Sequence, residues 1–302
     1  MEQQGRVAGI ELGGTKCILV LADAAGEILE QQTLPTRMPQ ETMHGIEAIL
    51  DGWWGDDPDR RGFGALGIAS FGPVGLNETA PNWGFITATA KPGWRDTPLR
   101  PPLAARYPVP VSFDTDVNGA ALAEQRWGAA QGLADFAYVT VGTGVGVGLI
   151  VNGSPTRGLG HCEAGHMHVA RLPGDDWAGA CPYHGACVEG LAAGPAIAAR
   201  LGTAGETVPH DHPVWNSVVE ALAQMAQAIV FATAPRRFLV GGGVMAHRSD
   251  LIARLDARVR ELVGSYLPLP PADADYVTAP GLGTRAGPLG PIALALGSME
   301  RG

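Results

Sequence analysis

The chain has 302 residues, of which 46% are hydrophobic and 17% are charged. This composition is typical of a packed globular protein with room for two domains, and it argues against disorder. The net charge is −9 and the basic residues are scattered, which argues against nucleic acid as a partner. No stretch approaches the roughly 20 apolar residues that cross a bilayer, and the N-terminus does not resemble a secretory signal. We therefore expect a cytoplasmic protein with no membrane partner.

Strands and helices alternate along the chain. In chain order we expect a strand–turn–strand segment at 7–22, a helix at 40–54, strands at 65–71 and 109–113, a helix at 117–128, strands at 136–141 and 145–151, helices at 195–202 and 214–232, a short strand at 238–240, and helices at 248–263 and 286–296. Residues 77–102 are typical of a binding loop, and residues 158–190 are irregular. The pattern predicts an α/β protein with two sheet-centred lobes and a ligand-binding cleft between them.

Three glycine-rich loops each follow a predicted strand. A single loop of this kind is more often a tight hairpin turn. Three of them favour a nucleotide site, because glycine lets the backbone approach a phosphate and the threonines and Lys16 add donors. The candidate ATP-binding residues are Gly13, Gly14, Thr15, Lys16, Thr140, Gly142, Thr143, Gly144, Gly241, Gly242 and Gly243.

The first loop, Gly9-Ile-Glu-Leu-Gly-Gly-Thr-Lys16, resembles the first phosphate motif of sugar kinases of the ROK (repressor, open reading frame, kinase) family. That resemblance implies a two-lobed actin-like ATPase (ribonuclease H-like) fold with a central cleft. It implies a small lobe over 1–114, with the last helix, about 286–300, packing back on it, and a large lobe over 115–285. Many members carry aspartate where this chain has Glu11, and this carboxylate would hold Mg²⁺ directly or through water.

The segment Ser112-Phe-Asp-Thr-Asp-Val-Asn118 precedes an apolar helix. From local sequence, Asp114, Thr115 or Asp116 is a helix cap. The segment also resembles the family motif Asn-Asp-Ala-Asn, which makes Asp116 the expected catalytic base and Asn118 the expected second asparagine. Thr115 replaces the first asparagine, so that sugar contact is not transferred to it.

The segment Cys181-Pro-Tyr-His-Gly-Ala-Cys187 places two thiols and the imidazole of His184 at the spacing of a structural zinc site. A fourth ligand is needed, and the upstream candidates are His161, Cys162, His166 and His168. Glu163-Ala-Gly-His166 resembles the family motif Glu-x-Gly-His, which indicates His166. With four protein ligands the ion would be structural, not catalytic.

The same resemblance implies the sugar site. Glu163 and Glu189 match family positions that hydrogen-bond sugar hydroxyls. The expected substrate-binding residues are Glu163, His166, Glu189, Asn118, Gly72 and Thr89. In the loop that contains Thr89, Lys91 and Trp94 are further candidates, and Trp94 is equally consistent with a place in the core.

Three stretches resemble bacterial fructokinases of the family more closely than its glucokinases. They are Ser70–Val74, Gly84–Trp94 and Cys181–Gly190. The implied reaction transfers the γ-phosphoryl group of ATP to the 6-hydroxyl of D-fructose, in a homodimeric enzyme.

The alternatives are a mannokinase or a broad hexokinase and, from another class, a non-catalytic sugar-binding protein. Sugar-responsive repressors of the family carry an additional N-terminal helix-turn-helix, and the early first strand leaves no room for one.

Overall fold

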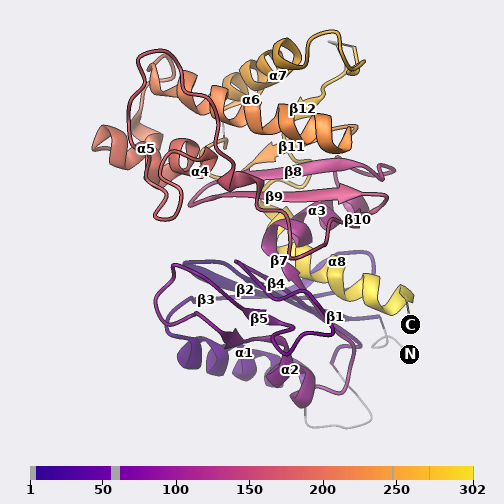
Figure 1. The fold of residues 1–302 in the computed structure, drawn as a ribbon. Coiled ribbons are helices and arrows are strands. Elements are labelled where there is room, and N and C mark those ends of the chain that lie inside the picture. The colour runs from indigo at the N-terminus through magenta and orange to yellow at the C-terminus, as the bar shows by residue number, and fades with distance from the viewer. Residues whose placement is uncertain (1–4, 56–61, 247, 272, 302) are drawn as a thin grey trace. The chain divides into compact units, whose positions relative to one another are not determined.

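The computed structural model describes residues 5–55, 62–246, 248–271 and 273–301. The chain forms two compact units (Figure 1). Unit 1 comprises Met1–Gln131, Thr156–His161 and Thr284–Gly302, and unit 2 comprises Gly132–Pro155 and Cys162–Gly283.

Unit 1 contains a five-stranded sheet in the order β3-β2-β1-β4-β7. The strands are β1 (Val7–Leu12), β2 (Lys16–Ala22), β3 (Ile28–Pro35), β4 (Leu66–Ser70) and β7 (Val111–Thr115). β1, β2 and β3 form an antiparallel meander, whereas β1, β4 and β7 run parallel to one another. A short hairpin, β5 (Phe85–Ile86) and β6 (Thr97–Pro98), lies within the predicted binding loop.

Helices cover both faces of this sheet. They are α1 (Pro39–Trp54), α2 (Arg100–Arg106), α3 (Asp116–Trp127) and α8 (Ala286–Arg301). Alternation along β1 separates the two faces, since Ile10 packs with the core that includes α1 and α2 and Val7 packs with α8. The α8 face needs a close approach, because a Cβ at Gly67 would lie 1.8 Å from the carbonyl oxygen of Pro291.

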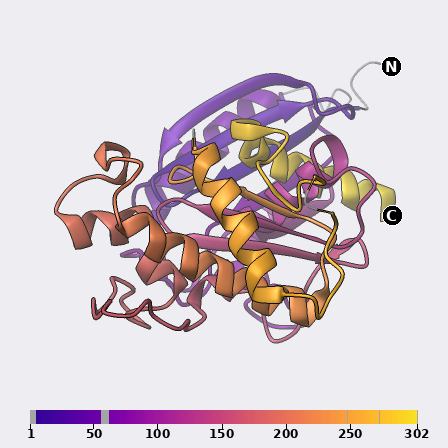
Figure 2. The same cartoon turned by 90° about the horizontal axis from the view of Figure 1, so that it is seen from above.

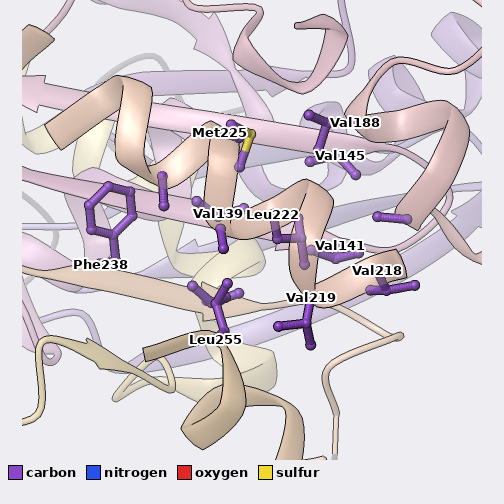
Figure 3. Close-up of a cluster of buried hydrophobic side chains, with 14 of the residues drawn as sticks. Val139, Val141, Val145, Val188, Val218, Val219, Leu222, Met225, Phe238 and Leu255 are labelled. Atoms are coloured by element: carbon purple, nitrogen blue, oxygen red, sulfur yellow. The ribbon is translucent and has the colours of Figure 1, made fainter. Parts of the chain in front are cut away.

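Unit 2 contains a second five-stranded sheet, in the order β10-β9-β8-β11-β12. The strands are β8 (Phe136–Val141), β9 (Val145–Val151), β10 (Ser154–Pro155), β11 (Phe238–Gly241) and β12 (Val277–Thr278). The helices are α4 (Val188–Ala192), α5 (Gly194–Leu201), α6 (Val214–Thr233) and α7 (Ser249–Val263), with short 3₁₀ turns at Ala164–His166 and Gly205–Thr207. A third 3₁₀ turn, Gly283–Arg285, lies where the chain passes from unit 2 to unit 1. α6 and α7 lie side by side (Figure 2). Their apolar faces meet the sheet at Leu222, Leu255 and Val139 (Figure 3).

The predicted elements are present, each within a few residues of its expected bounds, and the α/β class is confirmed. Both sheets begin with the expected strand–glycine turn–strand pattern. The expected division at residue 114 falls inside unit 1, because α3 packs against α8 and a Cβ at Gly290 would lie 2.7 Å from the backbone of Gly119. The assignment of functional lobes with a cleft between them stays a prediction.

No helix in the described part of the chain is long and apolar enough to cross a membrane.

Candidate active site

Three predicted site segments leave the first sheet at the same edge. Leu12 of β1 pairs with Ser70 of β4, and Ser70 pairs with Thr115 of β7. Because these strands are parallel, the residues that follow them emerge together at their carboxyl ends. These residues are the first glycine turn, the loop at Gly72, and Asp116. Ligands of open α/β sheets commonly bind at this edge.

The first glycine turn presents its backbone to solvent. The Gly13 N–H donates to the Lys16 carbonyl at 3.0 Å, which closes the turn, and the Thr36 hydroxyl donates to the Gly13 carbonyl at 2.8 Å. Residues Gly14, Thr15 and Lys16 are exposed. No heavy atom of the described residues outside the turn lies within 4 Å of a Cβ built at Gly14. The turn therefore leaves room for a phosphate group against its backbone.

The carboxylate of Glu11 lies beside this turn, against the first turn of α8. Its Oε2 atom is buried and has no hydrogen-bond partner among the described residues. A Cβ built at Gly287 in α8 would lie 2.3 Å from the Oε1 atom of Glu11. Burial raises the pKa of Glu11, and the charge of Lys16 lowers it. A buried carboxylate oxygen without a donor is costly unless a cation joins it, so this donor chemistry fits Mg²⁺.

Of the three candidates for the cap of α3, the structure selects Thr115. Its Oγ1 accepts a hydrogen bond from the Asn118 N–H at 3.1 Å. Asp116 is the first residue of the helix, is partly exposed, and accepts from the adjacent Val117 N–H at 2.9 Å. Its carboxylate therefore lies at the helix N-terminus, where the helix dipole favours negative charge.

Asp114 lies in the interior and organises this N-terminus. Its side chain is fully buried and accepts from the Thr115 N–H at 2.7 Å, from Asn118 Nδ2 at 2.8 Å and from Arg157 Nη2 at 2.7 Å. Burial raises the pKa of Asp114, and Arg157 and Asn118 lower it. Asn118 is itself buried, with its amide directed to Asp114. Its expected contact with the sugar stays a prediction.

The loop after β4 contains Gly72. A Cβ at Gly72 would lie 3.3 Å from the ring of His161, whose Nε2 accepts from the Val74 N–H at 3.1 Å. His161, one of the four upstream candidates for a zinc ligand, therefore braces this loop.

The binding loop reaches the first glycine turn through Lys91. Its Nζ donates to the Gly14 carbonyl at 2.5 Å, and its N–H donates to Thr89 Oγ1 at 3.2 Å. Trp94 is fully buried, and its Nε1 donates to the Arg37 carbonyl at 2.8 Å. Of the two interpretations of Trp94, the structure supports the one that places it in the core.

In unit 2, the other two glycine loops meet each other. β8 and β11 are parallel with Thr140 opposite Gly241, and the Val244 N–H donates to the Val141 carbonyl at 2.9 Å. Gly242 has a φ of 92°, and a Cβ there would lie 2.5 Å from the backbone of Val141. Only glycine fits so close an approach.

The remaining loop residues differ in exposure. Thr143 and Gly243 are exposed, and the Gly142 carbonyl accepts from the Gly194 N–H at the start of α5 at 2.8 Å. A Cβ at Gly144 would lie 2.6 Å from Glu189 Oε2. The loop after β8 is thus held between α5 and Glu189.

A cavity of about 520 Å³ opens beside the loop after β11. Gly243 and Val244 line one part of it, and Trp215 and Arg248 another. The Arg248 guanidinium lies 4.2 Å from the centre of the Trp215 ring, and its Nε and Nη2 each donate to Asp250 at 2.9 Å. The volume is in the range of small-molecule sites.

The four predicted zinc ligands come together in unit 2. The ligand atoms of His166, Cys181, His184 and Cys187 all lie within 4.8 Å of one another. His166 Nδ1 is 3.7 Å from each sulfur, and His184 Nδ1 is 3.8 Å from the Cys181 sulfur. In a tetrahedral zinc site, nitrogen and sulfur ligands lie about 3.5 Å apart. The set therefore fits zinc in chemistry and in spacing.

Both predicted sugar-binding glutamates lie next to His166. Glu163 Oε2 is 3.9 Å from His166 Nε2, and Glu189 Oε1 is 4.0 Å from His166 Nδ1. Glu189 Oε2 also accepts from the Val145 N–H at 3.2 Å. One carboxylate is therefore close to both the Cys/His cluster and the second glycine loop.

Several residues of these sites carry no local sequence signal. Arg157 is a single arginine in a glycine-rich stretch, and only the fold brings it to Asp114. Trp215 lies in the first turn of α6, and Arg248 immediately precedes α7. Their contact therefore depends on the packing of α6 against α7.

Known proteins resemble this chain over nearly its whole length. The ROK family model matches residues 7–298. A fructokinase from Zymomonas mobilis subsp. mobilis is 40% identical over 308 residues, with all of both chains covered. A fructokinase from Pediococcus pentosaceus is 38% identical over 294 residues, with 97% of this chain and 99% of the relative covered.

The fold is also shared with solved structures. A ROK hexokinase from Thermus thermophilus superimposes with a TM-score of 0.77 at 26% identity, covering 98% of this chain and 100% of that protein. The expected actin-like ATPase fold is thereby confirmed, and the chain belongs to the ROK family.

Proposed function

We propose that this protein is an ATP-dependent fructokinase that transfers the γ-phosphoryl group of ATP to the 6-hydroxyl of D-fructose. The observation that carries the phosphoryl-transfer chemistry is the single sheet edge in unit 1 at which the open glycine turn, Glu11 and Asp116 emerge. Fructose as the substrate is supported by the full-length similarity to proteins named fructokinases.

In this reaction Asp116 is the general base. Its carboxylate accepts the proton of the sugar hydroxyl as the hydroxyl oxygen bonds to the γ-phosphorus and the bond to ADP breaks. The backbone of the turn from Gly13 to Thr15 and the side chain of Lys16 hold the phosphate oxygens. Lys91, tied to Gly14, adds a second positive charge to the same turn.

Glu11 would hold Mg²⁺, directly or through water. The bound ion would neutralise charge on the phosphates of ATP. Glu11 suits this role because its buried Oε2 lacks a donor among the described residues and β1 holds it next to the turn.

In unit 2, the residues from Thr140 to Gly144 and from Gly241 to Gly243 bind the remainder of ATP. The cavity beside Gly243 suits the nucleoside, because its volume is in the range of small-molecule sites and it adjoins the loop after β11.

Glu163, Glu189 and His166 bind the sugar hydroxyls, with Gly72, Thr89 and Asn118 as further predicted contacts. Zinc held by His166, Cys181, His184 and Cys187 would fix the irregular segment that carries them. His166 Nδ1 faces the two sulfurs, which leaves Nε2 on the side of Glu163 as a donor. Hydrogen bonds to substrate hydroxyls can discriminate strongly among sugars when the groups that make them would otherwise be left unpaired.

We also propose that the enzyme is a cytoplasmic homodimer, as the resemblance to the family implies. Size-exclusion chromatography with light scattering measures its oligomeric state.

A coupled assay of ADP formation tests the function with fructose, mannose and glucose, each with Mg²⁺ and with EDTA. We expect kcat/KM for fructose to exceed that for glucose at least about tenfold, activity to require Mg²⁺, and the product to be fructose 6-phosphate. A higher kcat/KM for mannose would assign a mannokinase, and a preference for glucose would exclude a fructokinase. Sugar binding without turnover would identify a non-catalytic binding protein.

A further inference from the structure

Residues 156–161, here called the strap, belong to unit 1 although the chain on either side belongs to unit 2. We propose that Arg157 in the strap is a positioning residue for Asp116, acting through the buried carboxylate of Asp114. The inference rests on the proposed role of Asp116 as the base.

Asp114 needs a cationic partner. Its side chain has no exposed surface, whereas the Arg157 side chain is 45% exposed. A buried carboxylate without a cationic partner strongly destabilises the folded state. Arg157 supplies the charge and one hydrogen bond while the rest of its guanidinium stays hydrated, so the pair avoids the full cost of burying two ions.

The Asp114 carboxylate binds residues on both sides of Asp116, the backbone of Thr115 and the side chain of Asn118. The Thr115 N–H donates to its Oδ1, as does Asn118 Nδ2. Thr115 is also the cap of α3. Because Arg157 binds the other oxygen, Oδ2, it fixes the orientation of the carboxylate that these two residues share. The first turn of α3, and with it Asp116, is thereby set relative to β7.

A second contact fixes the strap to the same sheet edge. His161, its last residue, accepts from the Val74 N–H in the loop that contains Gly72. The strap is therefore anchored at the ends of both β4 and β7. Glu163 follows His161 by two residues, so the same segment leads directly into the predicted sugar-binding motif.

Steady-state kinetics and thermal unfolding of Arg157→Met, Arg157→Lys and the double variant Asp114→Asn/Arg157→Met test the inference. Arg126→Met is the matched control. Arg126 lies in the last turn of α3, the helix that Asp116 begins, and forms an exposed ion pair with Glu300 of α8. Asp116→Asn provides the reference for loss of the base.

We expect Arg157→Met to lower kcat by about 10- to 100-fold, as displaced catalytic groups do, with KM for ATP and fructose changed less than about threefold. Arg157→Lys should recover most of kcat, and Arg126→Met should stay within about twofold of the parent. The double variant removes the unpaired buried charge, so it should recover the melting temperature but not kcat.

Parental kcat in Arg157→Met, or recovery of both kcat and melting temperature in the double variant, would overturn the inference, because Arg157 would then only balance charge. Unreduced turnover in Asp116→Asn would overturn it together with the base assignment. Loss of turnover in Asp116→Asn without any loss in Arg157→Met would overturn this inference alone.

Discussion

The proposed base and the proposed sugar-binding groups are held in place in different ways. Asp116 lies where a strand passes into a helix, and a capping threonine and the ion pair of buried Asp114 with Arg157 fix that junction. Glu163 and His166 lie on a segment with little regular structure. That segment is held by side-chain clusters, one of which is the Cys/His set.

The comparison shows that a strand and a helix already fix the main chain around a functional side chain, so that few further contacts are needed. At the junction of β7 and α3, backbone hydrogen bonds and the apolar core already fix the main chain, so a few polar contacts suffice to orient one carboxylate. The segment at 158–190 has turns and isolated bridges in place of long strands or helices, so we expect ion pairs and the proposed zinc site to contribute more to its conformation. Changes at the junction should therefore alter chemistry, and changes in the segment should alter sugar affinity and stability together.

The largest expected effect is that of Asp116→Asn. Removing a general base should lower kcat by about 10³-fold, within the usual range for proton-transfer groups, and leave fructose binding in place. Turnover assays and isothermal titration measure the two quantities. Asp23→Asn is the control, because Asp23 accepts hydrogen bonds only from its own exposed turn in the described contacts, and amide oxygen can replace it there. Full activity of Asp116→Asn would exclude it as the base.

Cys181→Ser should have the next largest effect. Loss of one of four ligands should abolish the binding of about one zinc ion per chain, lower the melting temperature, and raise KM for fructose by about 10- to 100-fold. Metal analysis of protein purified without chelator measures the zinc content, thermal unfolding measures the melting temperature, and steady-state kinetics measure KM for fructose. Cys162→Ser is the control, because Cys162 lies on the same segment but outside the cluster. A metal-free parent protein would contradict the prediction.

A smaller effect is expected for Glu163→Gln. A lost hydrogen bond to a charged group is worth about 1.5–3 kcal/mol, so KM for fructose should rise about 10- to 100-fold at most, while KM for ATP should stay unchanged. Glu41→Gln, at an exposed i,i+4 ion pair, is the control. A rise in KM for ATP alone would place Glu163 with the nucleotide instead.

The smallest effect on catalysis, but a clear one on stability, is expected for Asp175→Asn. Burial acts to raise the pKa of Asp175, but hydrogen bonds from Arg200, Ser217 and Arg171 outweigh it and lower the pKa to about 2. The carboxylate therefore ties the irregular segment to α5 and α6.

Because the folded pKa of Asp175 is depressed, its contribution to stability is complete above about pH 4 and is lost as the pH falls toward 2. Asp175→Asn should lower the free energy of unfolding at pH 7 by about 2 kcal/mol and flatten its dependence on pH in that acidic range. Chemical denaturation from pH 7 to pH 2 measures both. An unchanged pH profile would show that the ion cluster does not hold the segment.

The sequence alone was sufficient for much of this picture. Glycine turns after apolar strands and the close Cys-His-Cys spacing are local patterns, and both predicted real structural features: adjoining loops after β8 and β11, and a four-residue cluster completed by His166. Contacts between distant residues could not be predicted in this way. Arg157 and Asp114 are 43 residues apart in the chain, and no periodicity relates them. The identity of the α3 cap could not be predicted from the sequence either, because Asp114, Thr115 and Asp116 all suit that role. The structure decides it, since β7 ends at Thr115 and places that side chain at the start of α3.

The packing of α8 has a consequence for how the protein is made. Unit 1 is built from residues up to Gln131, from the strap and from the last helix, and Gly287 in that helix packs against Glu11. On the ribosome, the apolar face of β1 and β4 that packs against α8 therefore stays uncovered until the whole of unit 2 and the last helix have been synthesised. The first sheet to be synthesised therefore cannot have both faces covered until the second sheet is complete.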